Sequence, residues 1–128
     1  MPKEKPPLHP SSRQKLGARG EQLAAQALVA AGYRIIRSDV RAKSGQVDIL
    51  AEEAGDLVFV EVKTRRTTTY GTPAEAVTPA KQRHLIAAAQ EYLASIDALD
   101  RPWRIDVVSI LLTGSTPAIE IIRHAVTG

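Results

Sequence analysis

The sequence predicts an α/β fold in which helices flank a mixed β-sheet, with the elements in the order α-β-β-β-α-β-β. Two observations support this prediction. Two segments carry apolar residues at helical spacing, and five short segments rich in Val, Ile, Leu and Phe lie between turn-forming residues. The second helical segment separates the third strand from the fourth, which favours a parallel crossover between them.

A first helix is expected at residues 12–31, with one apolar face and with Gly32 as its stop signal. Residues 1–11 precede it and hold four of the eight prolines, so we expect a disordered tail there and a single domain over residues 12–128. The apolar face consists of Leu16, Gly20, Leu23, Ala24, Ala27, Leu28 and Ala31.

Similar local signals bound the other elements. A loop is expected at 67–77, after which Thr78 can cap a second helix whose first position is Pro79. That helix is expected to end at residue 96. The five strands are expected at 33–38, 46–52, 57–64, 103–112 and 117–124.

The composition excludes several classes of protein. The chain has no cysteine, which rules out disulfides, thiolate nucleophiles and zinc sites with sulfur ligands. It shows neither the apolar core of a secretory signal nor a run of 18 apolar residues, so we expect a cytoplasmic protein without membrane association. The formal charge of +3 resides in residues 1–15, and the rest of the chain sums to zero. Net charge is therefore weak evidence for nucleic-acid binding.

Three charged residues interrupt two apolar segments in GQVDILAEEAGDLVFVEVKTRR, residues 45–66. The apolar alternation requires a hairpin loop of two residues at 54–55 or of four at 53–56, because a three-residue loop would mix the two faces. The expected pairs on the polar side are Asp48 with Glu61, Gln46 with Lys63 and Leu50 with Phe59. Those on the apolar side are Val47 with Val62, Ile49 with Val60 and Ala51 with Val58.

Two carboxylates side by side on a sheet repel each other, at a cost of about 0.2–1 kcal/mol. A divalent cation offsets that repulsion, so Asp48 and Glu61 are candidate ligands of Mg²⁺ or Mn²⁺, with waters and a phosphate as further ligands. Lys63 lies on the same side, where its amine can orient or deprotonate a water or stabilise negative charge at phosphorus. The alternative is an acid pair that shares solvent and is bridged by Lys63.

Two residues of the expected helices, Glu21 and Lys81, are candidates to approach the Asp48 and Glu61 pair. Glu21 lies at the border of the first helix's apolar face and either leans over the sheet or is a solvated edge residue. Lys81 shares the stripe of Leu85, Ala88 and Tyr92 on the second helix, so its amine either contacts a phosphate or extends past apolar neighbours into solvent.

Two clusters of basic residues are candidates for phosphate binding, and each taken alone is equally typical of a solvated surface. The first lies around the expected loop between strands one and two, and the second follows strand three. Their members are Arg34, Arg37, Arg41 and Lys43, and Lys63, Arg65 and Arg66. The candidate nucleic-acid contacts are Arg37, Arg41, Lys43, Gln46, Arg65, Arg66 and Lys81.

Asp48 followed by Glu61-Val62-Lys63 resembles the PD-(D/E)xK signature of restriction-endonuclease-like nucleases. Glu21, in GARGEQLAAQAL, resembles the extra acidic residue of the archaeal Holliday junction resolvases in that superfamily. More narrowly, residues 16–112 resemble the YraN family of small bacterial proteins, through GARGE, GYRIIRSDVRAKSGQVDIL, LVFVEVKTRR, YGTPAEAVTPAKQRHL and RIDVVSI.

This resemblance implies a restriction-endonuclease-like fold and a Mg²⁺- or Mn²⁺-dependent endonuclease that acts on DNA, including branched or structured DNA. The catalytic set would be Glu21, Asp48, Glu61 and Lys63, with the three acids as metal ligands, and the resolvase resemblance favours a homodimer. Where the family typically has GEIDLI this chain has GQVDIL, so Gln46 removes an acid beside Lys63 or near the metal.

Two alternatives stay open. One is a nucleic-acid-binding module on the same fold that cleaves nothing by itself. The other is a partner-binding protein in which the carboxylate pair is a relic. Cleavage assays with an Asp48 variant separate the enzyme from the binding module, and Mn²⁺ titration separates both from the relic.

Overall fold

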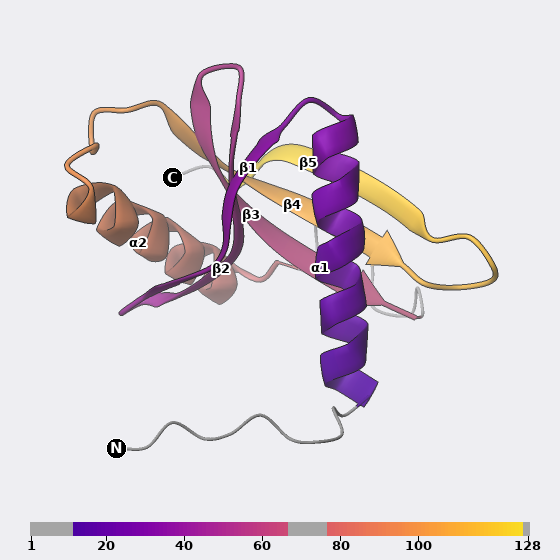
Figure 1. Ribbon diagram of the computed structural model, residues 1–128. Coiled ribbons are helices and arrows are strands. Elements are labelled where there is room, and N and C mark those ends of the chain that lie inside the picture. The colour runs from indigo at the N-terminus through magenta and orange to yellow at the C-terminus, as the bar shows by residue number, and fades with distance from the viewer. Residues whose placement is uncertain (1–11, 67–76, 127–128) are drawn as a thin grey trace, which may run out of the picture.

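Two helices and five strands make up the protein, in the predicted order (Figure 1). The computed structural model describes residues 12–66 and 77–126. The helices are α1 (Ser12–Ala30) and α2 (Pro79–Ser95), and the strands are β1 (Arg34–Ala42), β2 (Gly45–Glu53), β3 (Asp56–Arg65), β4 (Trp103–Leu111) and β5 (Ala118–Val126). The expected tail at 1–11 and residues 67–76 of the expected loop lie outside the described residues.

The strands form one mixed sheet in the order β1-β2-β3-β4-β5, which confirms the predicted fold class. Strands β3 and β4 are parallel, and the other neighbouring pairs are antiparallel. The chain between β3 and β4 contains α2, as a parallel connection requires. The carboxyl ends of β3 and β4 therefore lie at the same edge of the sheet.

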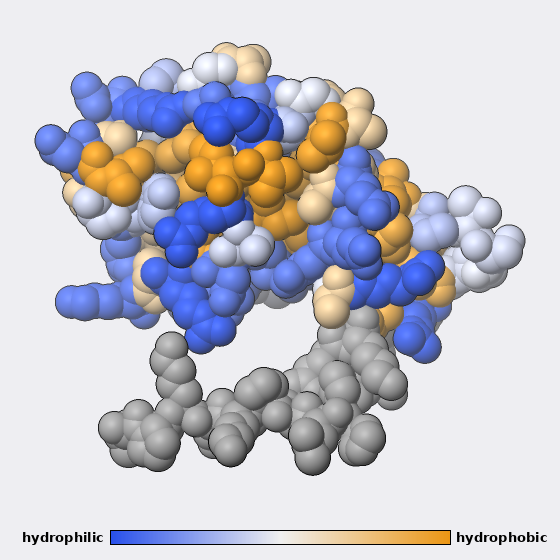
Figure 2. All heavy atoms as spheres, viewed as in Figure 1, coloured by the Kyte–Doolittle hydropathy of each residue, from blue (hydrophilic) through white to orange (hydrophobic). Residues whose placement is uncertain are grey.

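The two helices cover opposite faces of the sheet and form two hydrophobic cores (Figure 1). On one face, Ala24 and Leu28 of α1 pack against apolar residues of β2, β3 and β4. On the other, Leu85 and Leu93 of α2 pack with Phe59 of β3. Figure 2 shows apolar side chains gathered in the middle of the visible face, with hydrophilic ones around them. No helix in the described ranges is long and apolar enough to span a membrane.

Helix α1 approaches the sheet most closely at Gly20, which is buried against β3. A Cβ atom at Gly20 would lie 1.8 Å from Thr64 Oγ1 and 2.9 Å from Thr64 Cβ. Gly20, Ala24 and Leu28 are buried at four-residue spacing, so the helix rests on the sheet along a line that begins with its smallest residue. Glycine at position 20 thus lets the first half of α1 reach the end of β3.

Helix α2 begins where the sequence predicts. The Thr78 side chain accepts a hydrogen bond from Lys81 N–H at 3.2 Å, and Pro79 occupies the first helical position. The helix ends at Ser95, one residue before the expected end. This capped start fixes the first turn of α2, and with it Lys81, beside the end of the sheet.

Strand β1 differs from the prediction. It was expected to end at residue 38 but continues to Ala42, and a tight turn then leads directly into β2. Asp39 has a φ of 55°, and it has no partner in the pairing of β1 with β2, where Asp48 would otherwise oppose it. A left-handed residue inside a strand shifts the faces of the side chains after it, which hides the strand's alternation. Arg41 therefore lies on a strand and not in a loop.

A buried polar network joins the strands at the turn end of the β2–β3 hairpin. The Arg104 guanidinium, 6% exposed, donates to Asp106 at 3.0 Å, to Asp56 at 2.9 Å and to Glu53. The Tyr33 hydroxyl donates to Asp106 at 2.6 Å, and burial together with this bond raises the pKa of Tyr33 to about 12. Because each buried charge has several partners, the network offsets much of the cost of removing those charges from water.

Candidate metal centre

At its turn end the β2–β3 hairpin has the predicted register. Glu53 pairs with Asp56 across a two-residue turn in which Ala54 and Gly55 have φ angles of 54° and 87°. Positive φ at both central residues matches a type I′ turn, which suits the twist of paired strands. The predicted pairs Ile49 with Val60, Leu50 with Phe59 and Ala51 with Val58 are present. Of the two loop lengths that the alternation allows, the two-residue loop is therefore correct.

The hairpin opens beyond Ile49, the first residue of β2 that pairs with β3. From there the Asp48 carboxylate accepts a hydrogen bond from Val62 N–H at 2.8 Å. Val47 packs in the core on the α2 side, whereas Val62 packs on the α1 side, so their predicted pairing is wrong. The bend at Asp39 is the physical reason, because β2 follows its partner strand through the change of faces.

A cleft of about 380 Å³ lies at the open end of this hairpin, beside α1. The four residues predicted as the catalytic set, Glu21, Asp48, Glu61 and Lys63, all line it. Asp48 reaches the cleft offset from Glu61 by its bond to the β3 backbone, and not directly opposite as the register predicted. The other lining residues are Leu16, Gly17, Val62 and Thr64. Helix α1 and the consecutive strands β2 and β3 thus bring the predicted set together.

Glu61 is the most buried of the four, with a side chain that is 6% exposed. Its Oε1 atom lies 3.7 Å from Lys63 Nζ and 3.5 Å from Lys81 Nζ. Its Oε2 atom is buried and has no hydrogen-bond partner among the described residues. Unpaired buried carboxylate oxygens are costly, so Oε2 is the atom of this cleft with the strongest need for a ligand.

Burial is the main cause that raises the pKa values of the three acids, and the charges of nearby carboxylates add to it. Burial raises the pKa of Asp48, with a smaller contribution from Asp39, and the Val62 N–H and the two lysines oppose this. Burial and then the Asp48 charge raise the pKa of Glu61, against the effect of Lys81 and Lys63. For Glu21 the causes are burial followed by the charges of Asp48 and Asp39. Such shifts are typical of carboxylates that await a cation or a proton.

The donor set fits a hard divalent cation held by two carboxylates. Mg²⁺ is commonly bound through one or two carboxylates, with waters and substrate phosphate completing its ligands. Asp48 and Glu61 supply that pair, and the orphaned Oε2 of Glu61 supplies an acceptor inside the cleft. No group of three or more acidic or histidine side chains in the described chain is close enough to hold a metal by itself. Glu21 therefore lines the cleft without completing a three-acid cluster.

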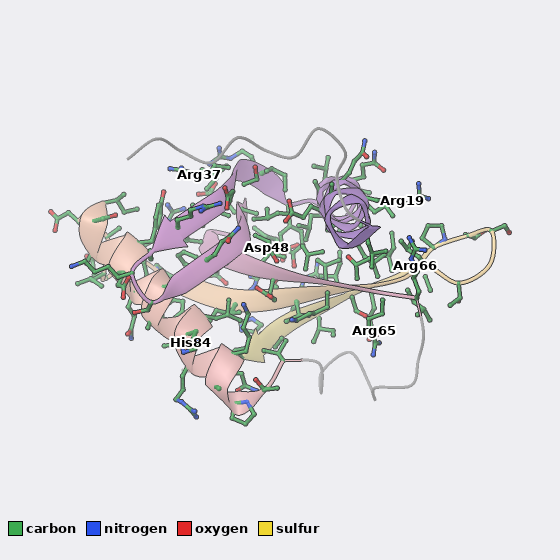
Figure 3. All side chains as sticks on the ribbon, turned by 90° about the horizontal axis from the view of Figure 1, so that it is seen from below. Arg19, Arg37, Asp48, Arg65, Arg66 and His84 are labelled. Atoms are coloured by element: carbon green, nitrogen blue, oxygen red, sulfur yellow. The ribbon has the colours of Figure 1, made fainter. Side chains whose placement is uncertain are left out.

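The first basic cluster lies on and after β1, and none of its members lines the cleft. Arg37 is exposed on β1 (Figure 3), and Arg41 pairs with Asp39 at 3.3 Å. Gln46 also donates to Asp39, so it does not face Lys63 as the register predicted. Lys43 is exposed at the turn between β1 and β2. Gln46 thus belongs to the surroundings of Asp39 and not to those of Lys63.

The second basic cluster divides between the two faces of the sheet. Arg65 lies on the face opposite α1, whereas Arg66 lies beside α1 and close to Arg19 (Figure 3). Lys81 contacts Glu61, which lines the carboxylate cleft, but Lys81 is not itself among the lining residues. The phosphate contacts predicted for these residues stay predictions.

Sequence reasoning missed two residues near the site. Asp39 adds its charge to those that raise the pKa values of Glu21 and Asp48. Arg19 lines a hollow on the other side of α1. The sequence could have predicted the position of Arg19. Gly20 lies on the buried face of α1, so its neighbours Arg19 and Glu21 must lie on either side of that face.

Comparisons with known proteins give a consistent family. The model of "Uncharacterised protein family UPF0102" matches residues 20–110. A UPF0102 protein of Symbiobacterium thermophilum is 54% identical over 96 residues, which cover 75% of this chain and 81% of the relative. One of Geobacter sulfurreducens is 50% identical over 111 residues, 86% of this chain and 87% of the relative.

Among solved structures, SfsA of Pyrococcus furiosus in complex with Ca²⁺ resembles this chain with a TM-score of 0.39 and 16% sequence identity. The similarity covers 91% of this chain and 65% of SfsA.

Proposed function

The chain belongs to the UPF0102 family, which is the YraN family of the resemblance, and we propose that it is a metal-dependent endonuclease acting on DNA. The observation that supports this proposal most is the state of Glu61. Its Oε2 atom is buried without a hydrogen-bond partner in the described chain, in a cleft that it shares with Asp48. A protein that used this cleft for stability alone would satisfy or remove that oxygen.

Asp48 and Glu61 would hold Mg²⁺ or Mn²⁺, with Glu21 as an additional ligand or the partner of a ligated water. When bound, the cation stabilises negative charge on the phosphate and lowers the pKa of a nearby water. The Val62 N–H holds Asp48 in place at 2.8 Å, so one ligand is oriented by the backbone of the strand that carries the other.

Lys63 and Lys81 have separate tasks in this proposal. Both amines oppose the effect of burial on the pKa of Glu61 and so favour the ionised form of this carboxylate. Lys63 lines the cleft with a side chain that is 32% exposed, where its amine can orient the attacking water and neutralise charge on the phosphoryl oxygens. Lys81 contacts the same carboxylate oxygen from α2, so it positions Glu61.

The second candidate function is a nucleic-acid-binding module that does not cleave. The contacts of Glu61 with two lysines favour it, because they already balance the charge of this carboxylate. Under this alternative the cleft would bind phosphate through the lysines and no cation through the acids. Calorimetric titration with Mn²⁺ separates the two, since heat that is lost in Glu61→Gln indicates a cation site.

Cleavage of supercoiled plasmid and of synthetic four-way junctions, with Mg²⁺ or Mn²⁺, tests the proposal. We expect Asp48→Asn and Glu61→Gln to lower the rate about 100-fold or more, because each removes a charged ligand. Glu120→Gln is the matched control, since Glu120 is an exposed acid on β5 outside the cleft. Equal rates for wild type, both cleft variants and the control would remove the enzyme claim and leave the binding module.

A further inference from the structure

A second hollow, of about 190 Å³, is lined by two arginines from separate elements and by the β4–β5 connection. Arg19 comes from α1, and Arg66 follows the end of β3. The connection contributes Leu112, Gly114, Ser115 and Pro117. Figure 3 shows Arg19 and Arg66 together beside α1, whereas Asp48 lies on the other side of that helix.

Gly20 explains why the two hollows lie on opposite sides of α1. Residues of a helix follow one another at about 100°, so Arg19 and Glu21 each lie about 100° from Gly20, in opposite directions. Gly20 is the residue that touches Thr64 of β3. The contact line of the helix therefore separates Glu21, which lines the carboxylate cleft, from Arg19, which lines the second hollow.

The described lining of the second hollow is positively charged. Among the residues that the structure describes, it contains two guanidinium groups and no acid. Within residues 12–66 and 77–126, neither Arg19 nor Arg66 has a carboxylate at ion-pair distance, whereas Arg34, Arg101 and Arg123 each contact a glutamate. Two arginines that share one concave site without a counter-charge favour an anion between them.

We propose that this hollow binds a phosphodiester group of the nucleic-acid strand that also places a phosphate in the carboxylate cleft. The forked guanidinium donors of Arg19 and Arg66 match the oxygens of a phosphate, and the Ser115 hydroxyl adds a third donor. That the ligand is a nucleic acid rests on the proposed function. That the hollow binds an anion rests on the residues that line it.

The spacing of the two hollows agrees with one continuous strand. Lys63 lines the cleft and Arg66 lines the second hollow, three residues further along the same chain. At about 3.3 Å per extended residue this separation is about 10 Å. Phosphates of one strand advance about 3.4 Å each along the helix axis and are farther apart along the backbone, so both sites can hold phosphates of one strand that lie at most a few nucleotides apart. Arg19 and Arg66 would thus fix the register of the strand relative to Asp48 and Glu61.

The test is binding of a fluorescent four-way junction and a matched duplex by fluorescence anisotropy in EDTA, where no cation-dependent cleavage occurs. The variants are wild type, Arg19→Ala/Arg66→Ala and Arg83→Ala. Arg83 is an exposed arginine of α2 outside both hollows, so it controls for the loss of surface charge. Thermal unfolding confirms that each variant folds, and Arg19→Lys/Arg66→Lys reports whether charge alone restores binding.

We expect the double alanine variant to bind about 10-fold more weakly or worse, and the slope of log K against log salt to decrease by about 1 to 2. Arg83→Ala should stay within about 2-fold of wild type. Equal losses of affinity in the double variant and in Arg83→Ala would overturn the assignment. So would a wild-type protein that binds neither the junction nor the duplex, including one that binds inorganic phosphate alone.

Failure of the proposed function gives a different result. If wild type binds DNA with the Arg19 and Arg66 dependence but cleaves none with Mg²⁺ or Mn²⁺, the endonuclease claim fails and this phosphate site stands. If cleavage depends on Asp48 while binding is unaffected by the double variant, the endonuclease stands and this site fails.

Discussion

The contact between Gly20 and Thr64 allows a prediction whose sign depends on two opposing effects. Gly20→Ala gains helix propensity worth about 1 kcal/mol. Against this gain, the new Cβ would lie 1.8 Å from Thr64 Oγ1 and 2.9 Å from Thr64 Cβ. Rotation of the threonine side chain moves Oγ1 but not Cβ, so the backbone of α1 or β3 must shift. Overpacking of this kind costs typically about 1–3 kcal/mol and exceeds the gain.

Gly17→Ala provides a matched control on the same helix. Apart from the helix's own nearby backbone, no atom of the described residues lies within 4 Å of a Cβ at Gly17, so the substitution gains propensity without a clash. We expect Gly17→Ala to stabilise the protein by about 0.5–1 kcal/mol and Gly20→Ala to destabilise it by up to about 2 kcal/mol. At about 3–5 °C per kcal/mol, the two melting temperatures should differ by several degrees in opposite directions from wild type.

Thermal and urea unfolding measure both variants, and Thr64→Ala completes a double-mutant cycle. Removing Oγ1 and Cγ2 should recover part of the loss in Gly20→Ala, with a coupling energy of about 0.5–3 kcal/mol. If Gly20→Ala proves as stable as Gly17→Ala, helix α1 does not rest on β3 at this point. The reasoning that places Glu21 and Arg19 on opposite sides of the contact line would then be refuted as well.

Three further predictions concern charge. Mn²⁺ should raise the melting temperature of wild type but not that of Asp48→Asn, and equal shifts would contradict a site at Asp48. Without metal, Asp48→Asn should be at least as stable as wild type, because the substitution removes a buried charge. The raised pKa values of Asp48 and Glu61 favour protonation, so the Mn²⁺ affinity measured by calorimetry should begin to fall at a pH above the ordinary carboxylate range. An affinity that does not change down to about pH 4 would argue against these ligands. Arg123 and Arg104 hold the pKa of Glu53 at about 2, so the contribution of Glu53 to stability is complete above about pH 4.5 and is lost as the pH falls toward 2. In urea unfolding, the free energy of unfolding of Glu53→Gln should therefore decrease less steeply than that of wild type over this pH range, and equal decreases would contradict the network.

The sequence was sufficient for the architecture because local signals and the global fold agree. The Ala54-Gly55 turn, the alternation on either side of it and the Thr78 cap each depend on residues within a few positions of one another. The same alternation placed Asp48 and Glu61 near each other, and Glu21, whose border position on its helix allowed either an approach to the sheet or a solvated edge, lines the cleft. The predicted register holds from the turn to Ile49 and fails beyond it, so the sequence predicted which residues gather but not how they pair.

The structural features that the sequence did not predict have one local cause and one long-range cause. A single left-handed residue, Asp39, changes the faces of β1 and β2, so that Val47 and Gln46 point elsewhere than the alternation implies. No propensity rule identifies such a residue in the middle of a strand. The partners of Arg104 lie far away in the chain, at Asp56 and Glu53, and periodicity contains no information about pairs at that separation.

The β2–β3 hairpin treats its charges in opposite ways at its two extremities. Near the turn, Glu53 and Asp56 are paired with Arg104, and Glu53 also with Arg123, while about 17 Å away, at five residues of 3.4 Å each, the charge of Asp48 opposes that of Glu61. The stabilising ion pairs and the proposed metal site thus lie at separate ends of one hairpin. Substitutions at the open end can accumulate without loss of the ion pairs that hold the strands together at the turn.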